Sequence, residues 1–265
     1  MDQLRDAWAR QETAHGCWVS LPGPHTTELV ARAGFDYACV DMQHGLADYA
    51  DAIAMLQVLE LGNATPIVRV PWNEPGIIGR MLDGGALGVI VPMVNSVADA
   101  EAAAHACRYP PRGGRSHGPI RAAAQHGPDY VPRANDRVIC IPMIETIDAV
   151  EHLDGILAVD GVDAIYVGPA DLSLSLGLAP GNNDDVPRFT ETIEHIAATA
   201  AAAGVVPGIH ANASLAARRR EQGYRMVTVA TDAVALRTTL ARELRDAVEG
   251  GAVEGGAADG DDAVY

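Results

Sequence analysis

The segment IYVGPADLS, residues 165–173, is an apolar, β-forming run that ends at Gly-Pro-Ala and is followed by an acid, Asp171. The earlier run VICIPMI, residues 138–144, ends in the same way at Glu145. The separation of the two acids is the length of one strand plus one helix. If this repeat is a βα unit, the two carboxylates follow neighbouring parallel strands and should converge.

The alternation of apolar runs and helical periods continues along the chain. The strand candidates are residues 16–20, 36–42, 66–70, 87–91, 137–144, 163–168, 205–210 and 225–230. The helix candidates are residues 25–34, 47–60, 74–85, 96–109, 146–158, 189–204, 212–223 and 232–248. Eight such units in 265 residues are typical of a single-domain (β/α)8 TIM barrel, which we expect over residues 1–248. A doubly wound open sheet is the alternative, but LPGPHTTE, residues 21–28, is not the Gly-rich first turn that it needs.

Two stretches interrupt this rhythm. Residues 108–135 are rich in Pro, Gly and Arg, and we expect a long loop there that serves as a lid or an interface. Residues 249–265 form an acidic tail rich in Gly, Ala and Asp. This tail cannot bury apolar area, so we expect it to be disordered.

Composition excludes several classes of partner and cofactor. The net charge of −16 and the lack of a basic stripe argue against a nucleic-acid partner. No uninterrupted apolar run is long enough to span a membrane, and the first 16 residues lack the apolar core of a signal peptide, so we expect a cytoplasmic protein. All 19 basic residues are arginine, which excludes a lysine Schiff base and a pyridoxal phosphate anchor. We also expect no organic cofactor.

Charged and polar residues follow several of the predicted strands. Asp41 and His44 follow the second strand, Arg69 ends the third, and Glu145 and Asp171 follow the fifth and sixth. In a β/α barrel, the side chains at the carboxyl ends of the strands face one shared mouth. These five residues therefore define the candidate site.

The two carboxylates at this mouth predict a metal site. Neighbouring anions repel each other unless one is protonated or a cation lies between them. Oxygen ligands favour a hard divalent ion such as Mg²⁺ or Mn²⁺. The ion could bind a chelating 2-oxo acid and polarise its keto group, and in a chain without lysine it is the route to an enolate that side chains can support.

Other residues at the strand ends have two interpretations each. Arg69, in an otherwise apolar strand, either stabilises a developing enolate oxygen or forms a structural ion pair with a barrel carboxylate. His44, three residues after Asp41, is either a general base or acid whose ring Asp41 orients, or a structural histidine. The N–H groups of Ala170 and Asp171 begin a helix and can bind a substrate carboxylate.

At these residues the sequence resembles the HpcH/HpaI aldolase family, the metal-dependent class II pyruvate aldolases. The similar segments include GCWVSLPGPHTTELVARAGFDYACVDMQHGLAD, LDGGALGVIVPMV, PMIET and VDAIYVGPADLSLSLG. The resemblance implies that Glu145 and Asp171 hold Mg²⁺, Mn²⁺ or Co²⁺. It also implies that His44, oriented by Asp41, acts on the aldol hydroxyl and that Arg69 binds the pyruvate enolate.

Further implications concern the substrate, the partners and the assembly. Ala170 would contact the substrate carboxylate through its backbone, and Asp83 would act across a subunit interface. A homo-oligomer is implied, commonly a hexamer built as a trimer of dimers, and we expect the C-terminal helix to be exchanged between subunits. Met143 and Gln43 depart from residues that are common in the family, which affects the expected water network and the aldehyde preference.

The sequence thus predicts an aldolase that reversibly cleaves a 4-hydroxy-2-oxo acid to pyruvate, or a close 2-oxo acid, and an aldehyde. A citrate-lyase-β-like or malyl-CoA-type lyase is the alternative enzyme, but it needs a basic site for coenzyme A phosphates that the N-terminal region does not show. A non-catalytic barrel that binds 2-oxo acids is the alternative from another class.

Overall fold

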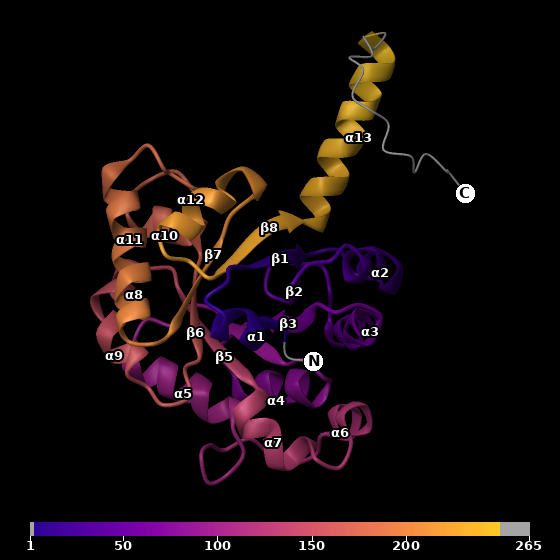
Figure 1. Cartoon of the computed structure of the whole chain (residues 1–265), viewed down its shortest axis with the longest axis vertical. Coiled ribbons are helices and arrows are strands. Elements are labelled where there is room, and N and C mark those ends of the chain that lie inside the picture. The colour runs from indigo at the N-terminus through magenta and orange to yellow at the C-terminus, as the bar shows by residue number, and fades with distance from the viewer. Residues whose placement is uncertain (1–2, 250–265) are drawn as a thin grey trace.

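The computed structural model describes residues 3–249, and its strands form one closed barrel of eight parallel strands in chain order (Figure 1). The strands are β1 (Ala14–Val19), β2 (Tyr37–Asp41), β3 (Thr65–Arg69), β4 (Gly88–Val91), β5 (Ile139–Ile144), β6 (Ala164–Val167), β7 (Val206–His210) and β8 (Met226–Thr231). All eight lie at the predicted positions, within about two residues at each end. The prediction of a (β/α)8 TIM barrel is confirmed.

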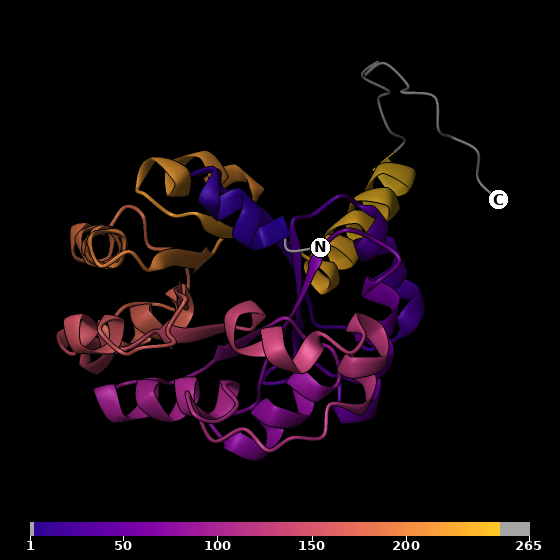
Figure 2. The same ribbon diagram turned by 60° about the horizontal axis from the view of Figure 1, so that its bottom comes forward.

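The described residues form thirteen α-helices, most of which surround the barrel on its outside (Figures 1 and 2). They are α1 (Gln3–Ala9), α2 (Pro24–Arg32), α3 (Tyr49–Leu59), α4 (Pro75–Asp83), α5 (Val97–Cys107), α6 (Ile120–His126), α7 (Tyr130–Arg137), α8 (Ile147–Glu151), α9 (Leu153–Leu157), α10 (Pro169–Ser175), α11 (Pro187–Ala202), α12 (Ala216–Glu221) and α13 (Asp232–Glu249), with a 3₁₀ turn at Ala213–Leu215. The predicted helix over residues 146–158 is two short helices, because the backbone of His152 leaves the helical region. The helix α1 was not predicted.

The segment of residues 108–135, expected to be a long loop, instead contains the short helix α6 and most of α7. Tyr109, Ala122, Tyr130 and Ala134 form a small apolar cluster of their own, separate from the barrel core. The expectation that the whole segment is a loop is therefore wrong. Burial of these side chains orders a segment whose Pro and Gly content had indicated a loop.

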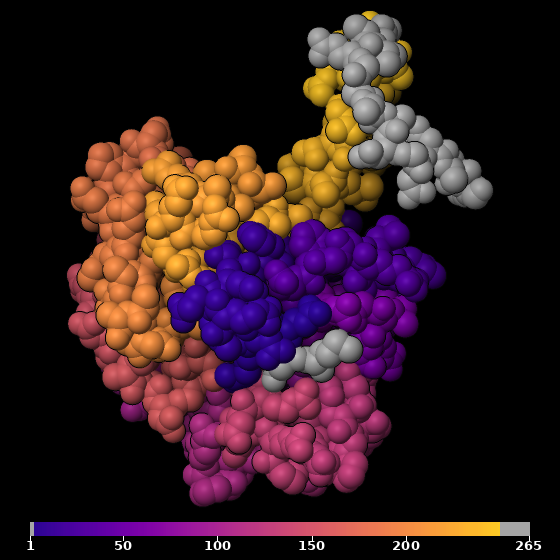
Figure 3. Space-filling model, viewed as in Figure 1, coloured from indigo at the N-terminus to yellow at the C-terminus, as the bar shows by residue number. Residues whose placement is uncertain are grey.

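The apolar side chains of the barrel form two layers. One lies between the strands and the surrounding helices, and the other fills the barrel interior. The interior includes Trp18, Tyr37, Ile141 and Tyr166, as expected for strands whose side chains alternate between the two faces. The N-terminal segment lies over the centre of the face shown in Figure 3, where Leu4 of α1 joins the interior cluster.

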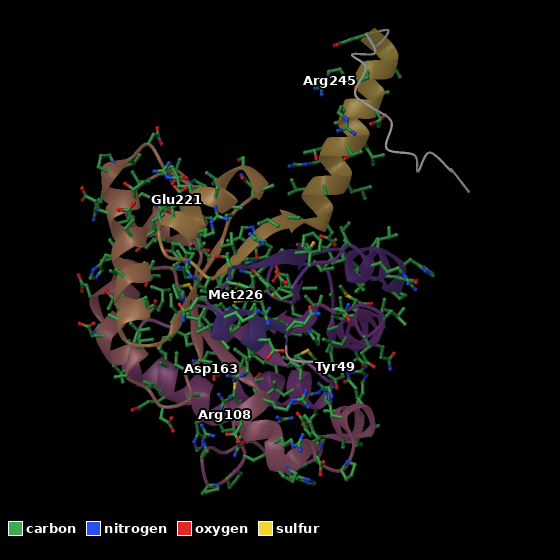
Figure 4. The ribbon with its side chains drawn as sticks, viewed as in Figure 1. Tyr49, Arg108, Asp163, Glu221, Met226 and Arg245 are labelled. Atoms are coloured by element: carbon green, nitrogen blue, oxygen red, sulfur yellow. The ribbon has the colours of Figure 1, made fainter. Side chains whose placement is uncertain are left out.

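An ion-pair cluster forms at the amino ends of the strands. Asp163 precedes β6 and pairs with Arg5 of α1 at 2.9 Å and with Arg108 at 2.7 Å. Its carboxylate also accepts the N–H of Cys140 at 2.8 Å. Figure 4 shows Arg108 and Asp163 in this part of the molecule. The cluster ties α1, β5 and β6 together at the closed end of the barrel.

The helix α13 projects away from the barrel in Figures 1 and 3, and it contains no buried residue. Of its five exposed large apolar residues, Leu236, Leu240, Leu244 and Val248 recur every four positions, so they share one face. The predicted tail lies outside the described residues, apart from Glu249. None of the helices in residues 3–249 is long and apolar enough to cross a membrane.

Candidate active site

A cavity of about 280 Å³ opens at the carboxyl ends of the strands. Among the predicted site residues, it is lined by His44, Arg69, Glu145, Ala170 and Asp171. The structure therefore brings together, at one mouth, residues that follow four different strands. This convergence is the arrangement that the strand-end positions predicted.

Asp41 and Arg69 form a buried ion pair beneath this cavity. They lie opposite each other in the β2–β3 register, and the Arg69 fork donates from Nε to Asp41 Oδ1 at 2.8 Å and from Nη2 to Oδ2 at 2.6 Å. Trp18 Nε1 also donates to Oδ2, at 3.1 Å. Burial would raise the pKa of the Asp41 carboxyl, but the hydrogen bonds and charge of Arg69 outweigh it and lower that pKa below its usual value. Arg69 therefore forms the structural ion pair of the second interpretation, and its oriented guanidinium also lines the cavity.

His44 lies at the cavity, but its ring is not held as the sequence suggested. Asp41 Oδ1 accepts the backbone N–H groups of Gln43 at 3.0 Å and His44 at 3.3 Å. Among the described residues, none hydrogen-bonds to the His44 imidazole. The expectation that Asp41 orients this ring is corrected, because both Asp41 oxygens are occupied by Arg69 and Trp18. Asp41 instead shapes the loop that carries His44.

Glu145 is almost fully buried, and only one of its two carboxylate oxygens accepts a hydrogen bond from the described residues. Its Oε1 accepts the backbone N–H of Met93 at 2.8 Å, whereas Oε2 has no hydrogen-bond partner in the described part of the chain. Burial, with a contribution from the nearby Asp171, raises the pKa of the Glu145 carboxyl to about 7. A buried carboxylate oxygen without a donor is costly, so a site of this kind requires a ligand or a proton.

Gly168 explains how the space beside this oxygen is kept open. A Cβ at Gly168 would lie 2.5 Å from Glu145 Oε2, so no larger residue fits without movement. Asp171 follows in the first turn of α10, behind Pro169, whose ring suits the first helical position. Ala170 lines the same cavity, and its N–H is one of those that a helix start leaves without an internal acceptor.

These residues fit a hard divalent ion. Glu145 Oε2 is an unused anionic oxygen, Asp171 supplies a second carboxylate at the same cavity, and their mutual repulsion would be relieved by a cation. Within residues 3–249 no group of three or more His, Cys, Asp or Glu side chains forms a metal-binding cluster. The remaining ligands would therefore have to come from substrate and water, as is usual for Mg²⁺.

Asp83, the remaining predicted site residue, does not reach this cavity in its own chain. It ends α4, where its Oδ1 accepts from Arg115 Nη2 at 2.6 Å. Arg115 is buried between the rings of Tyr109 and Tyr130, and it also donates to the Tyr130 hydroxyl at 3.0 Å. The segment that was expected to be a loop thus holds Asp83 at the molecular surface.

Several cavity residues were not predicted, among them Trp18, Tyr166, Asn182 and His210. Trp18 and Tyr166 lie inside strands, and only the alternation of the strand side chains could have assigned them to the interior. His210 is the last residue of β7, so the same strand-end rule that identified Glu145 would have identified it. Asn182 belongs to an irregular segment after α10, where the sequence gives no signal.

Comparisons with family models, curated proteins and solved structures all point to aldolases of one family. The HpcH/HpaI aldolase/citrate lyase family model matches residues 14–238. A hydroxypyruvate/pyruvate aldolase of Rhizorhabdus wittichii is 38% identical over 93% of this chain and 99% of its own. A 5-keto-4-deoxy-D-glucarate aldolase of Salmonella paratyphi A is 39% identical over 90% of this chain and 93% of its own. The crystal structure of a family protein from Burkholderia cenocepacia has a TM-score of 0.86 at 33% identity, over 94% of this chain and all of the other.

Proposed function

This chain belongs to the HpcH/HpaI aldolase/citrate lyase family and is an aldolase, and we propose that it reversibly cleaves a 4-hydroxy-2-oxo acid to pyruvate, or a close 2-oxo acid, and an aldehyde. The observation that carries the proposal is the unpartnered, buried Oε2 of Glu145 beside Asp171, in a cavity that Arg69 also lines. Relatives named as aldolases at this level of identity favour this reaction over cleavage of a coenzyme A thioester.

We propose that Glu145 and Asp171 hold Mg²⁺, Mn²⁺ or Co²⁺. When bound, such an ion supplies Lewis acidity to the keto group of the substrate. Arg69 has a second role in this arrangement. Asp41 uses its Nε and Nη2, so Nη1, for which no acceptor lies among the described residues, is free to donate to the developing enolate oxygen.

His44 is proposed as the proton acceptor and donor of the reaction. In cleavage it takes the proton of the C4 hydroxyl, the C3–C4 bond breaks, and the bonding electrons form the enolate of the 2-oxo acid. The aldehyde leaves, and C3 is then protonated. Ala170 lines the same cavity, and its N–H is proposed to donate to the substrate carboxylate and so to set the direction of the carbon chain.

Aldol addition of pyruvate to a panel of short aldehydes tests this proposal, with Mg²⁺, Mn²⁺ or Co²⁺ and again with excess chelator. We expect metal-dependent product and, without aldehyde, exchange of the pyruvate methyl protons in D₂O. Full activity in the chelator would overturn the role of the ion. Binding of pyruvate with neither product nor exchange would overturn the reaction and indicate a binding barrel.

We also propose a homo-oligomer, a hexamer built as a trimer of dimers, in which α13 is exchanged between subunits. The support is its exposed apolar face, because such a face is stabilised by packing against another protein surface. Light scattering should show a smaller particle for the double change Leu240→Glu and Leu244→Glu. Arg242→Glu, at an exposed position on the opposite face of the same helix, is the control. An unchanged mass for the double variant would contradict the exchange.

In this assembly, we propose that the partner subunit's Asp83 completes the site. Asp83 lies at the end of α4 away from its own cavity, and among the described residues nothing donates to its Oδ2. Subunits carrying Asp83→Asn and subunits carrying Glu145→Gln should each be inactive alone. Mixed oligomers should regain part of the activity if the acid acts across the interface. No recovery in confirmed mixed oligomers would place Asp83 outside the reaction.

A further inference from the structure

His210 lies at the cavity, on the side of the closed barrel opposite β3 and Arg69. Its ring is nearly perpendicular to that of Trp18, with 5.1 Å between centroids, and Trp18 stacks on Tyr166 at 5.5 Å. These rings fix the imidazole plane. His210 therefore belongs to a rigid aromatic wall that borders the substrate space without being one of the proposed metal or enolate residues.

The polar groups of Trp18 and Tyr166 in this wall are hydrogen-bonded within the protein, whereas those of the His210 ring are not bonded to any described residue. Trp18 Nε1 donates to Asp41, and the Tyr166 hydroxyl bonds to Thr228. In contrast, no hydrogen bond joins the ring nitrogens of His210 to any described residue. A polar group held in place at a cavity, with its donor and acceptor both unused, is available to a ligand.

The protonation state of His210 is set by its surroundings. Burial, reinforced by the positive charge of Arg69 and opposed by Asp41, lowers the pKa of His210 to about 4. The ring is therefore neutral at physiological pH, with one N–H donor and one nitrogen acceptor. A neutral ring with so low a pKa is a poor general base near pH 7 but a good partner for an uncharged polar group.

Asn182 adds a second unused donor at the same cavity. Its Oδ1 accepts from Arg219 Nη2 at 2.8 Å, and Arg219 is itself held by two 2.7 Å bonds to Asp184. Because the oxygen of Asn182 is engaged by Arg219, its amide N–H₂ group is the part left for a ligand. The cavity therefore presents uncharged polar groups in addition to the charged ones of the proposed reaction.

We propose that His210 is a specificity-determining residue that binds a hydroxyl group on the substrate carbon chain, so that hydroxylated substrates are favoured over unsubstituted ones. A hydroxyl both donates and accepts a hydrogen bond, which matches the two nitrogens of a neutral imidazole. The hydroxyl belongs to C3 of a hydroxylated 2-oxo acid or to the aldehyde. A site with buried polar groups for a hydroxyl discriminates against the analogue that lacks it, because those groups are then left unpaired. The inference rests on the proposed function.

The test measures kcat/KM for matched substrate pairs with the Mg²⁺-loaded enzyme. Hydroxypyruvate is compared with pyruvate, each with acetaldehyde, and glycolaldehyde is compared with acetaldehyde, each with pyruvate. In His210→Leu we expect a loss of about tenfold for the hydroxylated member of one pair and less than about twofold for its plain counterpart. His210→Gln, which keeps a donor and an acceptor, should retain most of the preference. The pair that responds identifies the hydroxyl.

His195→Leu, at an exposed position of α11, is the matched control and should leave both ratios unchanged. If His210→Leu does not fold, as judged by circular dichroism, His210→Phe takes its place with the same expected result. An equal loss for both members of each pair, or unchanged ratios, would overturn the assignment, since a purely structural role has no reason to distinguish them.

Calorimetric binding of hydroxypyruvate and pyruvate, with Mg²⁺ present, separates this inference from the proposed function. If the wild-type protein turns over no pair, the proposed reaction fails, and binding then decides the role of His210. A preference for hydroxypyruvate that His210→Leu removes would support it. Equal binding of both acids by the wild-type protein, or no binding of either, together with the absence of turnover, would overturn it.

Discussion

Two carboxylates at opposite ends of the barrel, the partly buried Asp163 and the buried Glu145, have opposite surroundings. Asp163, at the amino end of β6, is paired with two arginines and accepts a backbone N–H. Glu145, at the carboxyl end of β5, accepts a single backbone N–H and keeps one oxygen without a partner among the described residues. At the closed end, arginines of the same chain neutralise Asp163. At the mouth, no described residue does the same for Glu145 Oε2.

This difference separates structural from functional charge. An acid with complete partners ties elements together, and removing Asp163 leaves the buried cation of Arg108 and the partly exposed one of Arg5 uncompensated. A buried acid with an unused oxygen is unfavourable for the empty protein, and it becomes favourable only with a bound ion or proton. The unused carboxylate oxygen at the mouth therefore lowers the stability of the empty protein, whereas the ion pairs at the closed end stabilise the fold.

The largest effect should come from Glu145→Gln. We expect kcat/KM for aldol addition to fall by about a thousandfold or more, because the amide cannot supply the anionic oxygen that the site needs. The free energy of unfolding should be unchanged or higher, since a poorly compensated buried charge is removed. Activity assays and urea denaturation measure the two quantities. Glu151→Gln, at an exposed position of α8, is the control and should change neither.

The opposite pattern is expected for Asp163→Asn. The free energy of unfolding should fall by about 3 kcal/mol, because Arg108 and Arg5 lose their anion. The folded fraction should keep kcat and KM within about twofold, since Asp163 is at the far end of the barrel. Urea denaturation with activity normalised to folded protein checks both values. If Asp163→Asn is stable but inactive, Asp163 is not a purely structural acid, and the contrast with Glu145 is contradicted.

Most of the fold and much of the site follow from the sequence for a physical reason. Each strand is a short apolar run that ends at a polar residue or a turn, so its position and its final residue are local information. In contrast, α1 and α7 bury few side chains each, and α7 contains Pro132, so local patterns underrate them. Tertiary contacts supply what the sequence pattern lacks.

The one corrected role within the site, that of Asp41, has the same origin, and so has the unpredicted contact of Asp83 with Arg115. The spacing of Asp41 and His44 indicates that they are close, but it does not show which group takes each carboxylate oxygen. Arg69 takes both because the β2–β3 register places its fork directly opposite Asp41. Likewise, Asp83 was assigned by resemblance, and its contact with Arg115 depends on a segment whose structure was not predicted.

Gly168→Ala tests whether the space beside Glu145 Oε2 is needed for metal binding, without changing any charge. The added Cβ would lie against Glu145 Oε2, so we expect the affinity for Mn²⁺ and the activity to fall by about ten- to a hundredfold. Gly79→Ala, whose Cβ would meet nothing within 4 Å, is the matched control and should leave both unchanged. Metal titration of the two variants measures the effect. Equal affinities would mean that the space beside this oxygen is not used.

A smaller effect should appear in the pH dependence of stability. The folded-state pKa of His210, about 4, lies below its unfolded value of about 6.5, so the folded state binds fewer protons between these values. Stability is therefore lost as pH falls below about 6.5, by about 2 kcal/mol at pH 5. In His210→Gln this part of the loss should vanish, as measured by urea denaturation at pH 7 and pH 5. An identical pH dependence in both proteins would contradict a neutral, buried ring.

Binding of Mn²⁺, followed by electron paramagnetic resonance, tests the difference between the two ends most directly. The wild-type protein and Asp163→Asn should each bind one ion per subunit, whereas Glu145→Gln and Asp171→Asn should bind none at the same concentrations. Undiminished binding by both mouth variants, or no binding by the wild-type protein, would contradict the assignment of the unpartnered carboxylate oxygen to a metal.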